Sequence, residues 1–212
     1  MKKRERIEII KKELFSIYWD REIELDHEND FQLLIAIIMS AQATDKWVNK
    51  VNQTFFQYLK APEDGIEMWE DKIREHIKRI GLFRWKSRNI HQTCLDIVHI
   101  YNGKIPGTIE ELTKLPGVGI KTAKVYLWVT TNAPYLAVDT HVHRTLNRLW
   151  IVKTKLPLQT DKAAEKIFTD DDTAKLHHSL VLFGRYHCIA RKPKCKTCPL
   201  LDVCPYKKKN LD

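Results

Sequence analysis

The sequence has no long apolar segment, because none of its hydrophobic runs reaches the roughly 18 residues that a membrane-spanning helix requires. Residues 1–6 lead into an amphipathic pattern instead of the apolar centre of a secretion signal, and no targeting extension is apparent. We therefore expect a cytoplasmic protein of prokaryotic type that makes no contact with a membrane.

The signals of β-structure and of repeats are also missing. The sequence contains no sustained two-residue alternation with hairpin turns, no repeat of about 20 to 50 residues and no low-complexity linker. Apolar residues recur instead at helical spacing in residues 7–18, 47–55, 73–80 and 90–101. The sequence therefore predicts an all-α fold.

Two apolar segments indicate where the core lies. Residues 31–39 are apolar on nearly every side, which is typical of a helix buried in the middle of a bundle. Cysteine is scarce outside one C-terminal cluster, and the isolated Cys94 lies on the apolar stripe of residues 90–101. We expect this small thiol to fill core space and assign it no chemistry.

Acidic residues are outnumbered by basic ones. The chain holds 36 Lys and Arg against 27 Asp and Glu, so its formal charge is +9 at pH 7. This balance favours a polyanionic partner such as nucleic acid. Many basic proteins merely stay soluble, however, so the motifs must decide the partner.

A turn with two glycines and one proline joins two predicted helices in residues 115–123. Gly117 and Gly119 allow the backbone to come close to a ligand. The next helix begins there with unpaired N–H groups and the positive end of its dipole, which suits a phosphate. An ordinary turn between helices would have the same glycine spacing.

Lys121 is predicted to lie in the first turn of this second helix. The positive end of the helix dipole disfavours a cation there and so favours the neutral, nucleophilic amine. Such an amine can attack an electrophilic sugar carbon and form a Schiff base. Taken alone, a lysine at this position is more often a phosphate contact than a nucleophile.

Asp139 stands at a predicted helix N-cap, with Val142, Leu146 and Leu149 forming an apolar helix face behind it. Capping alone would explain this aspartate. A capping carboxylate is also rigidly aimed, which is useful for catalysis, so the two roles are compatible.

Four of the five cysteines have the spacing C-x6-C-x2-C-x5-C, formed by Cys188, Cys195, Cys198 and Cys204. In a reducing compartment this spacing favours a metal site over disulfides. A zinc ion and an iron–sulfur cluster both accept four thiolates, so the spacing does not separate them. The basic residues between the cysteines would be displayed on a stiff loop, a good arrangement for contacting phosphates.

The chain resembles the endonuclease III family of helix-hairpin-helix DNA glycosylases. The resemblance rests on four features that follow one another in this order: the hairpin, Lys121, Asp139 and the cysteine spacing. The likeness runs nearly end to end. The segments that carry it are residues 40–45 (SAQATD), 115–123 (LPGVGIKTA), 138–141 (VDTH) and 184–193 (GRYHCIARKP).

The resemblance implies the domain organisation. It predicts a six-helix barrel domain with the helix-hairpin-helix over residues 22–133. Residues 1–21 and 134–212 would form a discontinuous cluster domain, with a [4Fe-4S] loop at 188–204 and the active-site cleft between the two domains. We expect a monomer associated with nucleoid DNA.

The resemblance also implies the chemistry. The enzyme would remove oxidised pyrimidines from damaged double-stranded DNA and then cleave the strand 3′ to the abasic site by β-elimination. Lys121 would attack the sugar C1′, Asp139 would assist by electrostatics and proton transfer, and the four cysteines would hold [4Fe-4S].

Further positions are expected to contact DNA. Gln42 would fill the space left by the extruded nucleotide, and Leu82 would wedge into the opposite strand. The remaining expected contacts are Gly117, Gly119, Thr122, His141, Arg144, Arg191 and Lys192.

Three positions depart from the family pattern. Ile120 replaces a common basic residue, His143 replaces a bulky apolar one, and residues 83–85 (FRW) after the wedge leucine are unusually large. These departures bear on which lesion is preferred.

Two other functions compete with this interpretation. A monofunctional glycosylase for uracil, mismatched thymine or adenine would share the hairpin and the cluster but lack Lys121. The adenine branch also carries an additional C-terminal domain, whereas this chain ends eight residues after Cys204. A non-catalytic helix-hairpin-helix DNA-binding protein would have no use for Lys121 together with Asp139.

Overall fold

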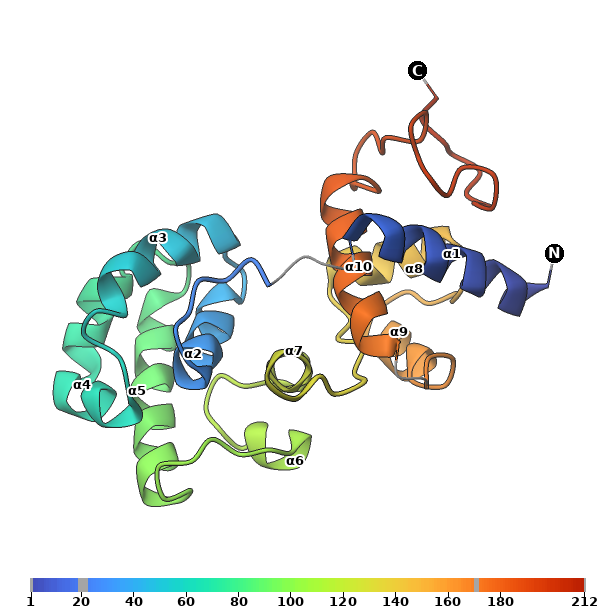
Figure 1. Cartoon of the computed structure of the whole chain (residues 1–212). Coiled ribbons are helices and arrows are strands. Elements are labelled where there is room, and N and C mark those ends of the chain that lie inside the picture. Colours follow the sequence, from blue (N-terminus) through green and yellow to red (C-terminus); the bar gives the residue numbers. More distant parts are fainter. Residues whose placement is uncertain (1, 19–22, 170–171, 212) are drawn as a thin grey trace. The chain divides into compact units, whose positions relative to one another are not determined.

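The computed structural model describes residues 2–18, 23–169 and 172–211 (Figure 1). These residues contain ten helices and no strand, so the predicted all-α fold is confirmed. None of the described helices is long and apolar enough to cross a membrane. The helices are α1 (Lys3–Tyr18), α2 (Asp30–Ser40), α3 (Asp45–Phe55), α4 (Pro62–Ile77), α5 (Phe83–His99), α6 (Ile109–Leu112), α7 (Ile120–Thr131), α8 (Thr140–Arg148), α9 (Pro157–Ala164) and α10 (Thr173–Tyr186).

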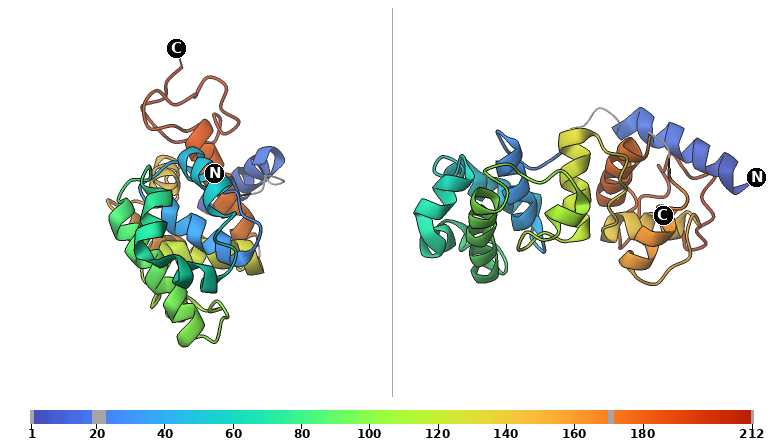
Figure 2. Two further views of the ribbon diagram at one scale, coloured as in Figure 1. Left: turned by 90° about the vertical axis from the view of Figure 1, so that its left-hand side faces the viewer. Right: turned by 90° about the horizontal axis from the view of Figure 1, so that it is seen from below.

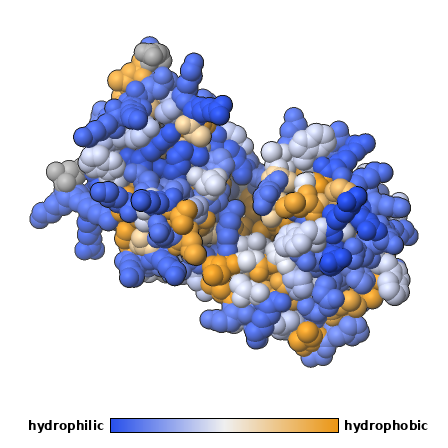
Figure 3. Space-filling view, turned by 180° about the vertical axis from the view of Figure 1, so that it is seen from behind, coloured by the Kyte–Doolittle hydropathy of each residue, from blue (hydrophilic) through white to orange (hydrophobic). Residues whose placement is uncertain are grey.

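The chain forms two compact units. One comprises Met1–Glu22 and Asn132–Asp212, and the other comprises Ile23–Thr131. The domain boundary expected between residues 21 and 22 falls outside the described residues. Hydrophilic side chains cover most of the face in Figure 3, as expected when 30% of the residues are charged.

In the Ile23–Thr131 unit, α2 is the central helix and packs against α3, α5 and α7. All residues from Phe31 to Met39 are buried, which confirms the predicted buried helix. It begins at Asn29, whose side chain accepts a hydrogen bond of 2.9 Å from the Gln32 amide. Burial of these apolar side chains stabilises the unit.

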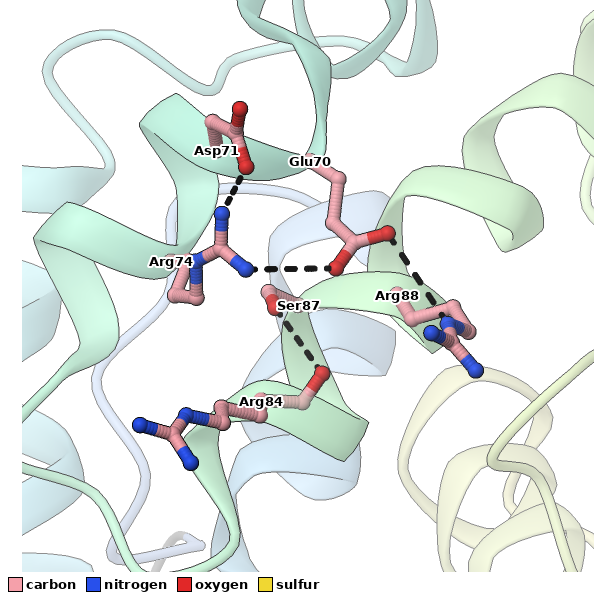
Figure 4. Close-up of polar contacts among 6 residues, drawn as sticks. All are labelled: Glu70, Asp71, Arg74, Arg84, Ser87 and Arg88. Carbon is pink, nitrogen blue, oxygen red and sulfur yellow. Dashed lines mark hydrogen bonds and ion pairs between the residues drawn. The ribbon is translucent and has the colours of Figure 1, made fainter.

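Helices α4 and α5 lie side by side in the same unit. The α4 backbone is kinked at Trp69, whose φ is 54°. Figure 4 shows Glu70 of α4 between two guanidinium groups, with its carboxylate 3.9 Å from Arg74 and 3.9 Å from Arg88 of α5. Arg74 also pairs with Asp71. These are surface ion pairs, so apolar packing between the helices contributes more than they do.

Cys94 lies in the α4–α5 interface and is fully buried, as predicted. Burial raises the pKa of its thiol to about 12. A Cβ added to Gly65 of α4 would overlap the Cys94 sulfur, so the glycine allows the two helices to approach closely. The thiol therefore fills core space and stays protonated at neutral pH.

In the other unit, α1 lies beside α10 although the two helices are far apart in the sequence (Figures 1 and 2). The apolar face of α1, with Ile7, Ile10 and Leu14, joins a core to which α8 and α10 contribute Leu146 and Leu180. The chain continues after α10 as a segment without helices that contains the four clustered cysteines.

Candidate active site and cysteine cavity

The predicted helical hairpin is present between α6 and α7. Gly117 has a φ of 82°, in the left-handed region that favours glycine. A Cβ there would also lie 3.2 Å from Asn89 and 3.3 Å from Ile38. Gly119, in contrast, has nothing within 4 Å of an added Cβ, and its carbonyl accepts the first helical bond of α7 from Ala123 at 2.9 Å. Its surroundings are open where the helix N-terminus begins.

Helix α5 contacts the hairpin through two side chains, Asn89 and Thr93. The Thr93 hydroxyl donates a hydrogen bond of 2.9 Å to the carbonyl of Pro116, and the side chain of Asn89 lies against Gly117. Neither residue was predicted from the sequence, because each appeared only as a polar position on an amphipathic helix. Their contacts fix the hairpin relative to α5.

Lys121 lies in the first turn of α7, as predicted, and its side chain is exposed. Lys124 on the same helix is only 2% exposed. Thr122 is half-buried beside the hairpin. In this unit, therefore, α7 presents the Lys121 amine to solvent directly after a glycine turn.

Asp139 is the N-cap of α8, as predicted. Its Oδ1 accepts a hydrogen bond of 2.8 Å from the Val142 amide. Leu136, Ala137 and Val138 before it are buried and anchor the approach to the helix. The carboxylate is therefore held in one orientation. Asp139 and Lys121 belong to different units.

Gly184 allows α10 to cross α8 at close range. A Cβ at this position would lie 2.9 Å from the Cβ of His141 and 3.0 Å from the hydroxyl of Thr145. Any larger residue would push the two helices apart.

Arg144 joins α8 to the end of α10. Its Nε donates to the Cys188 carbonyl at 3.0 Å, and its Nη2 donates to the Gly184 carbonyl at 2.6 Å. The same Nη2 lies 3.3 Å from Nδ1 of His141. Burial, and then repulsion from Arg148, lowers the pKa of Arg144. The sequence did not predict these internal contacts, and the expected DNA contact of Arg144 remains a prediction.

Arg148, one turn further along α8, holds the start of the cysteine segment. Its guanidinium donates to the carbonyls of Ile189 at 2.8 Å and Ala190 at 2.9 Å, and it lies 3.5 Å from the sulfur of Cys188. It also stacks 4.8 Å above the ring of Tyr206. Two arginines of α8 thus position the backbone around the first cysteine.

All four clustered cysteines line one cavity. Apolar walls come from Phe183 and Leu200. Burial raises the pKa of the Cys198 thiol to about 11, with the three neighbouring thiols acting in the same direction. Among the described residues, no three His, Cys, Asp or Glu side chains are placed to hold a single metal ion. Arg191 and Lys192 are exposed on the segment between the first two cysteines.

Gln42 and Leu82, the two residues expected to enter the duplex, lie on neighbouring loops of the Ile23–Thr131 unit. Both are exposed, and both have left-handed backbones, with φ of 55° and 60°. A Cβ on Gly81 would lie 3.4 Å from the carbonyl oxygen of Gln42, so the two loops approach each other. Such backbone conformations are uncommon for residues other than glycine.

The positions that depart from the family pattern have different surroundings. Ile120 and Trp85 are each 50% exposed, next to Lys121 and on the first turn of α5 respectively. His143 has its Nδ1 2.6 Å from the hydroxyl of Thr160 on α9. Ile120 and Trp85 are therefore available to a ligand, whereas His143 is engaged within its own unit.

Comparisons with known proteins agree with this geometry. The family model described as "HhH-GPD superfamily base excision DNA repair protein" matches residues 35–170, a range that includes Gln42, Leu82, Lys121 and Asp139. Endonuclease III of Bacillus subtilis (strain 168) is 44% identical over 184 residues, which are 86% of this chain and 84% of that protein.

Solved structures are similar as well. A trapped endonuclease III–DNA covalent intermediate has 40% identity and a TM-score of 0.90, covering 97% of this chain and 97% of its own. A non-covalent endonuclease III–DNA complex has the same identity and TM-score and covers 97% of this chain and 96% of its own.

Proposed function

Because the chain belongs to the endonuclease III family of HhH-GPD base excision DNA repair proteins, we propose that it is a bifunctional DNA glycosylase and abasic-site lyase acting on oxidised pyrimidines in duplex DNA. The observation that carries this proposal is the exposed Lys121 amine at the start of α7, directly after the glycine hairpin. A binding module needs the hairpin but not this amine.

Lys121 is the proposed nucleophile. Its neutral amine attacks C1′ of the damaged nucleotide, the bond between C1′ and the base breaks, and the base leaves with its electron pair and takes up a proton. The amine loses its proton and the sugar ring opens, which gives a protonated Schiff base. That cation acidifies the C2′ proton, so β-elimination breaks the C3′–O bond, and water then hydrolyses the Schiff base to free Lys121.

Asp139 is the proposed carboxylate partner. Its capping bond to Val142 fixes its orientation, so no reorganisation is needed when positive charge develops on the sugar. It also accepts the proton that the Lys121 amine loses during the attack. Both roles need a carboxylate that is ionised when the attack begins.

The nucleotide must leave the base stack before Lys121 reaches it, at a cost of a few kcal/mol that is lowest for damaged bases. We propose that Gln42 fills the space it leaves and that Leu82 wedges into the opposite strand. Their exposure on adjacent loops supports this pair of roles.

The cysteine cavity fits a [4Fe-4S] cluster held by Cys188, Cys195, Cys198 and Cys204. Zinc needs its sulfurs about 2.3 Å from one point, whereas no three of the described His, Cys, Asp or Glu side chains converge on a single metal ion, although all four cysteines line one cavity. Burial raises the pKa of the Cys198 and Cys204 thiols, so a cationic group is needed for these two to become thiolates together. When bound, the cluster supplies metal–thiolate bonds that cross-link residues 188–204. The excision and elimination steps themselves are redox-neutral.

Further contacts to phosphate complete the proposal. The amides near Gly117, Gly119 and Thr122 at the start of α7 would bind the strand through the hairpin. The side chains of His141, Arg144, Arg191 and Lys192 would contact the backbone from the other unit. We propose that the Ile23–Thr131 unit is the barrel domain, that the other unit is the cluster domain, and that the enzyme works as a cytoplasmic monomer on nucleoid DNA.

The test uses wild type, Lys121→Gln and Asp139→Asn on duplexes that carry thymine glycol, uracil opposite guanine or an abasic site. Base release and nicking are scored separately, and borohydride is added to reduce any Schiff base to a stable adduct. Lys104→Gln, at another exposed lysine, is the matched control. We expect wild type and the control to excise thymine glycol and to be trapped, and Lys121→Gln to do neither. Binding without excision or trapping by wild type would leave the DNA-binding module as the function.

A further inference from the structure

Lys86 of α5 is a lysine with no exposed surface. Its Nζ donates hydrogen bonds of 2.8 Å to the carbonyl of Met39 and 2.7 Å to the carbonyl of Ala41. Both acceptors lie at the C-terminal end of α2, where carbonyls lack helical partners and the helix dipole attracts a cation. Lysine is almost never fully buried without such partners. Burial lowers the pKa of this ammonium to about 8.

The position of Lys86 connects it to both exposed loops. The Ala41 carbonyl that it holds belongs to the peptide bond leading into Gln42. Its own backbone N–H donates a hydrogen bond of 3.0 Å to the carbonyl of Leu82. One residue therefore bonds to the backbone beside Gln42 through its side chain and to the backbone of Leu82 through its main chain.

These bonds act on backbone that needs support. Gln42 and Leu82 both have positive φ, which costs of order 1–3 kcal/mol for a residue other than glycine unless the surroundings impose it. The amide of Ala43 bonds back to the Ser40 carbonyl at 3.0 Å and closes the Gln42 loop around this strained residue. Without Lys86, the carbonyls at the base of this loop would lose their buried donor.

We propose that Lys86 is a positioning residue that couples the Gln42 and Leu82 loops, so that both side chains are already aligned when they enter the duplex during base extrusion. The inference rests on the proposed function and on the roles given there to Gln42 and Leu82. Lys86 itself does not touch the nucleotide. Its contribution belongs to extrusion and not to the Schiff-base chemistry, because a site that is already abasic has no base to extrude.

The experiment compares Lys86→Met, of similar length but without donors, with wild type and with the exposed control Lys104→Met. Single-turnover excision is measured on thymine glycol paired with adenine, and borohydride trapping is measured on an abasic duplex. A 2-aminopurine next to the lesion reports unstacking. We expect excision and the unstacking rate to fall about tenfold or more, as when a hydrogen bond to a charged group is lost, and trapping to stay within about twofold of wild type.

A second measurement tests whether the effect passes through the loops. In a Gln42→Ala, Leu82→Ala background, Lys86→Met should cause little further loss, because residues that act through one element are not additive. Full additivity in this background would overturn the inference, as would an equal fall of excision and trapping in Lys86→Met.

The result is interpretable even if one variant misfolds or the function differs. If circular dichroism shows that Lys86→Met does not fold, Lys86→Leu, which also lacks a donor, is measured in its place against the same expectations. If wild type itself neither excises nor traps, the proposed function has failed. If wild type does both and Lys86→Met equals it in excision, only the coupling by Lys86 is wrong.

Discussion

The Nε of Arg144 donates a 3.0 Å hydrogen bond to the carbonyl oxygen of Cys188, and so joins α8 to the first residue of the cysteine segment. The same helix begins at Asp139, whose carboxylate caps it. The orientation of the proposed catalytic carboxylate and the path of the cysteine segment therefore depend on one nine-residue helix being held in place at both ends.

Replacing Arg144 by methionine should lower the free energy of unfolding by about 1.5–3 kcal/mol, because the carbonyls of Gly184 and Cys188 lose a charged donor. Urea unfolding measures this change, with the exposed Arg191→Met as the control that leaves stability unchanged within about 0.5 kcal/mol. If Arg144 instead served only as a phosphate contact, its variant would keep full stability and lower the salt dependence of DNA binding by about one unit of slope.

Substitutions at Asp139 should separate capping from catalysis. Asparagine caps a helix about as well as aspartate, so Asp139→Asn should retain stability and lose excision. Asp139→Ala should lose excision and also about 1 kcal/mol of stability, since the Val142 amide is left without its acceptor. Thermal unfolding and single-turnover excision are measured on the same preparations. Normal excision by Asp139→Asn would restrict this residue to its capping role.

Two glycines form a matched pair for stability. An alanine Cβ at Gly184 would lie 2.9 Å from His141, so Gly184→Ala should destabilise the protein by about 1–3 kcal/mol through overpacking of α8 against α10. Gly119→Ala meets nothing within 4 Å and should leave stability nearly unchanged. Urea midpoints of both variants test the pair. For DNA binding we expect the opposite: Gly119→Ala should weaken binding more than Gly184→Ala does, because the open surface at Gly119 is where phosphate is proposed to approach.

Cys94 should make the free energy of unfolding fall as the pH rises above 9. Its thiol pKa is raised by burial from 9.0 to about 12 in the folded protein. The unfolded chain therefore loses this proton first, and the stability that the neutral thiol provides is complete below pH 9 and declines as pH rises from 9 towards 12. The unfolding free energy of wild type should fall more steeply across this range than that of Cys94→Ala. Parallel pH profiles would mean that the thiol ionises equally in both states.

Local sequence signals predicted the parts of the site that depend on neighbouring residues. Glycine spacing indicated the hairpin, the run of residues 31–39 indicated the central helix, and the residues after Asp139 indicated its N-cap. Each of these features forms within a few residues of the chain, where backbone preferences and periodicity decide the outcome.

The missed features all depend on contacts between distant segments. Arg144 was expected to contact DNA and Lys86 was assigned no role, yet each bonds to a carbonyl more than 40 positions away. The kink at Trp69 was also not predicted, because nothing in the local pattern of α4 departs from a helix. The predicted stripe of residues 73–80 extends beyond α4, which ends at Ile77. Only the folded chain shows which buried acceptors a lysine or arginine can reach.

Along α5, Leu82, Lys86, Asn89 and Thr93 stand at successive turns, and they connect the wedge, the Gln42 loop and the hairpin. A helix turns by about 100° per residue, so one residue inserted between Lys86 and Asn89 would rotate the hairpin contacts away from their partners. This stretch therefore does not tolerate a change of length. Insertions and deletions among proteins that use this wedge and hairpin should be confined to the connections outside it.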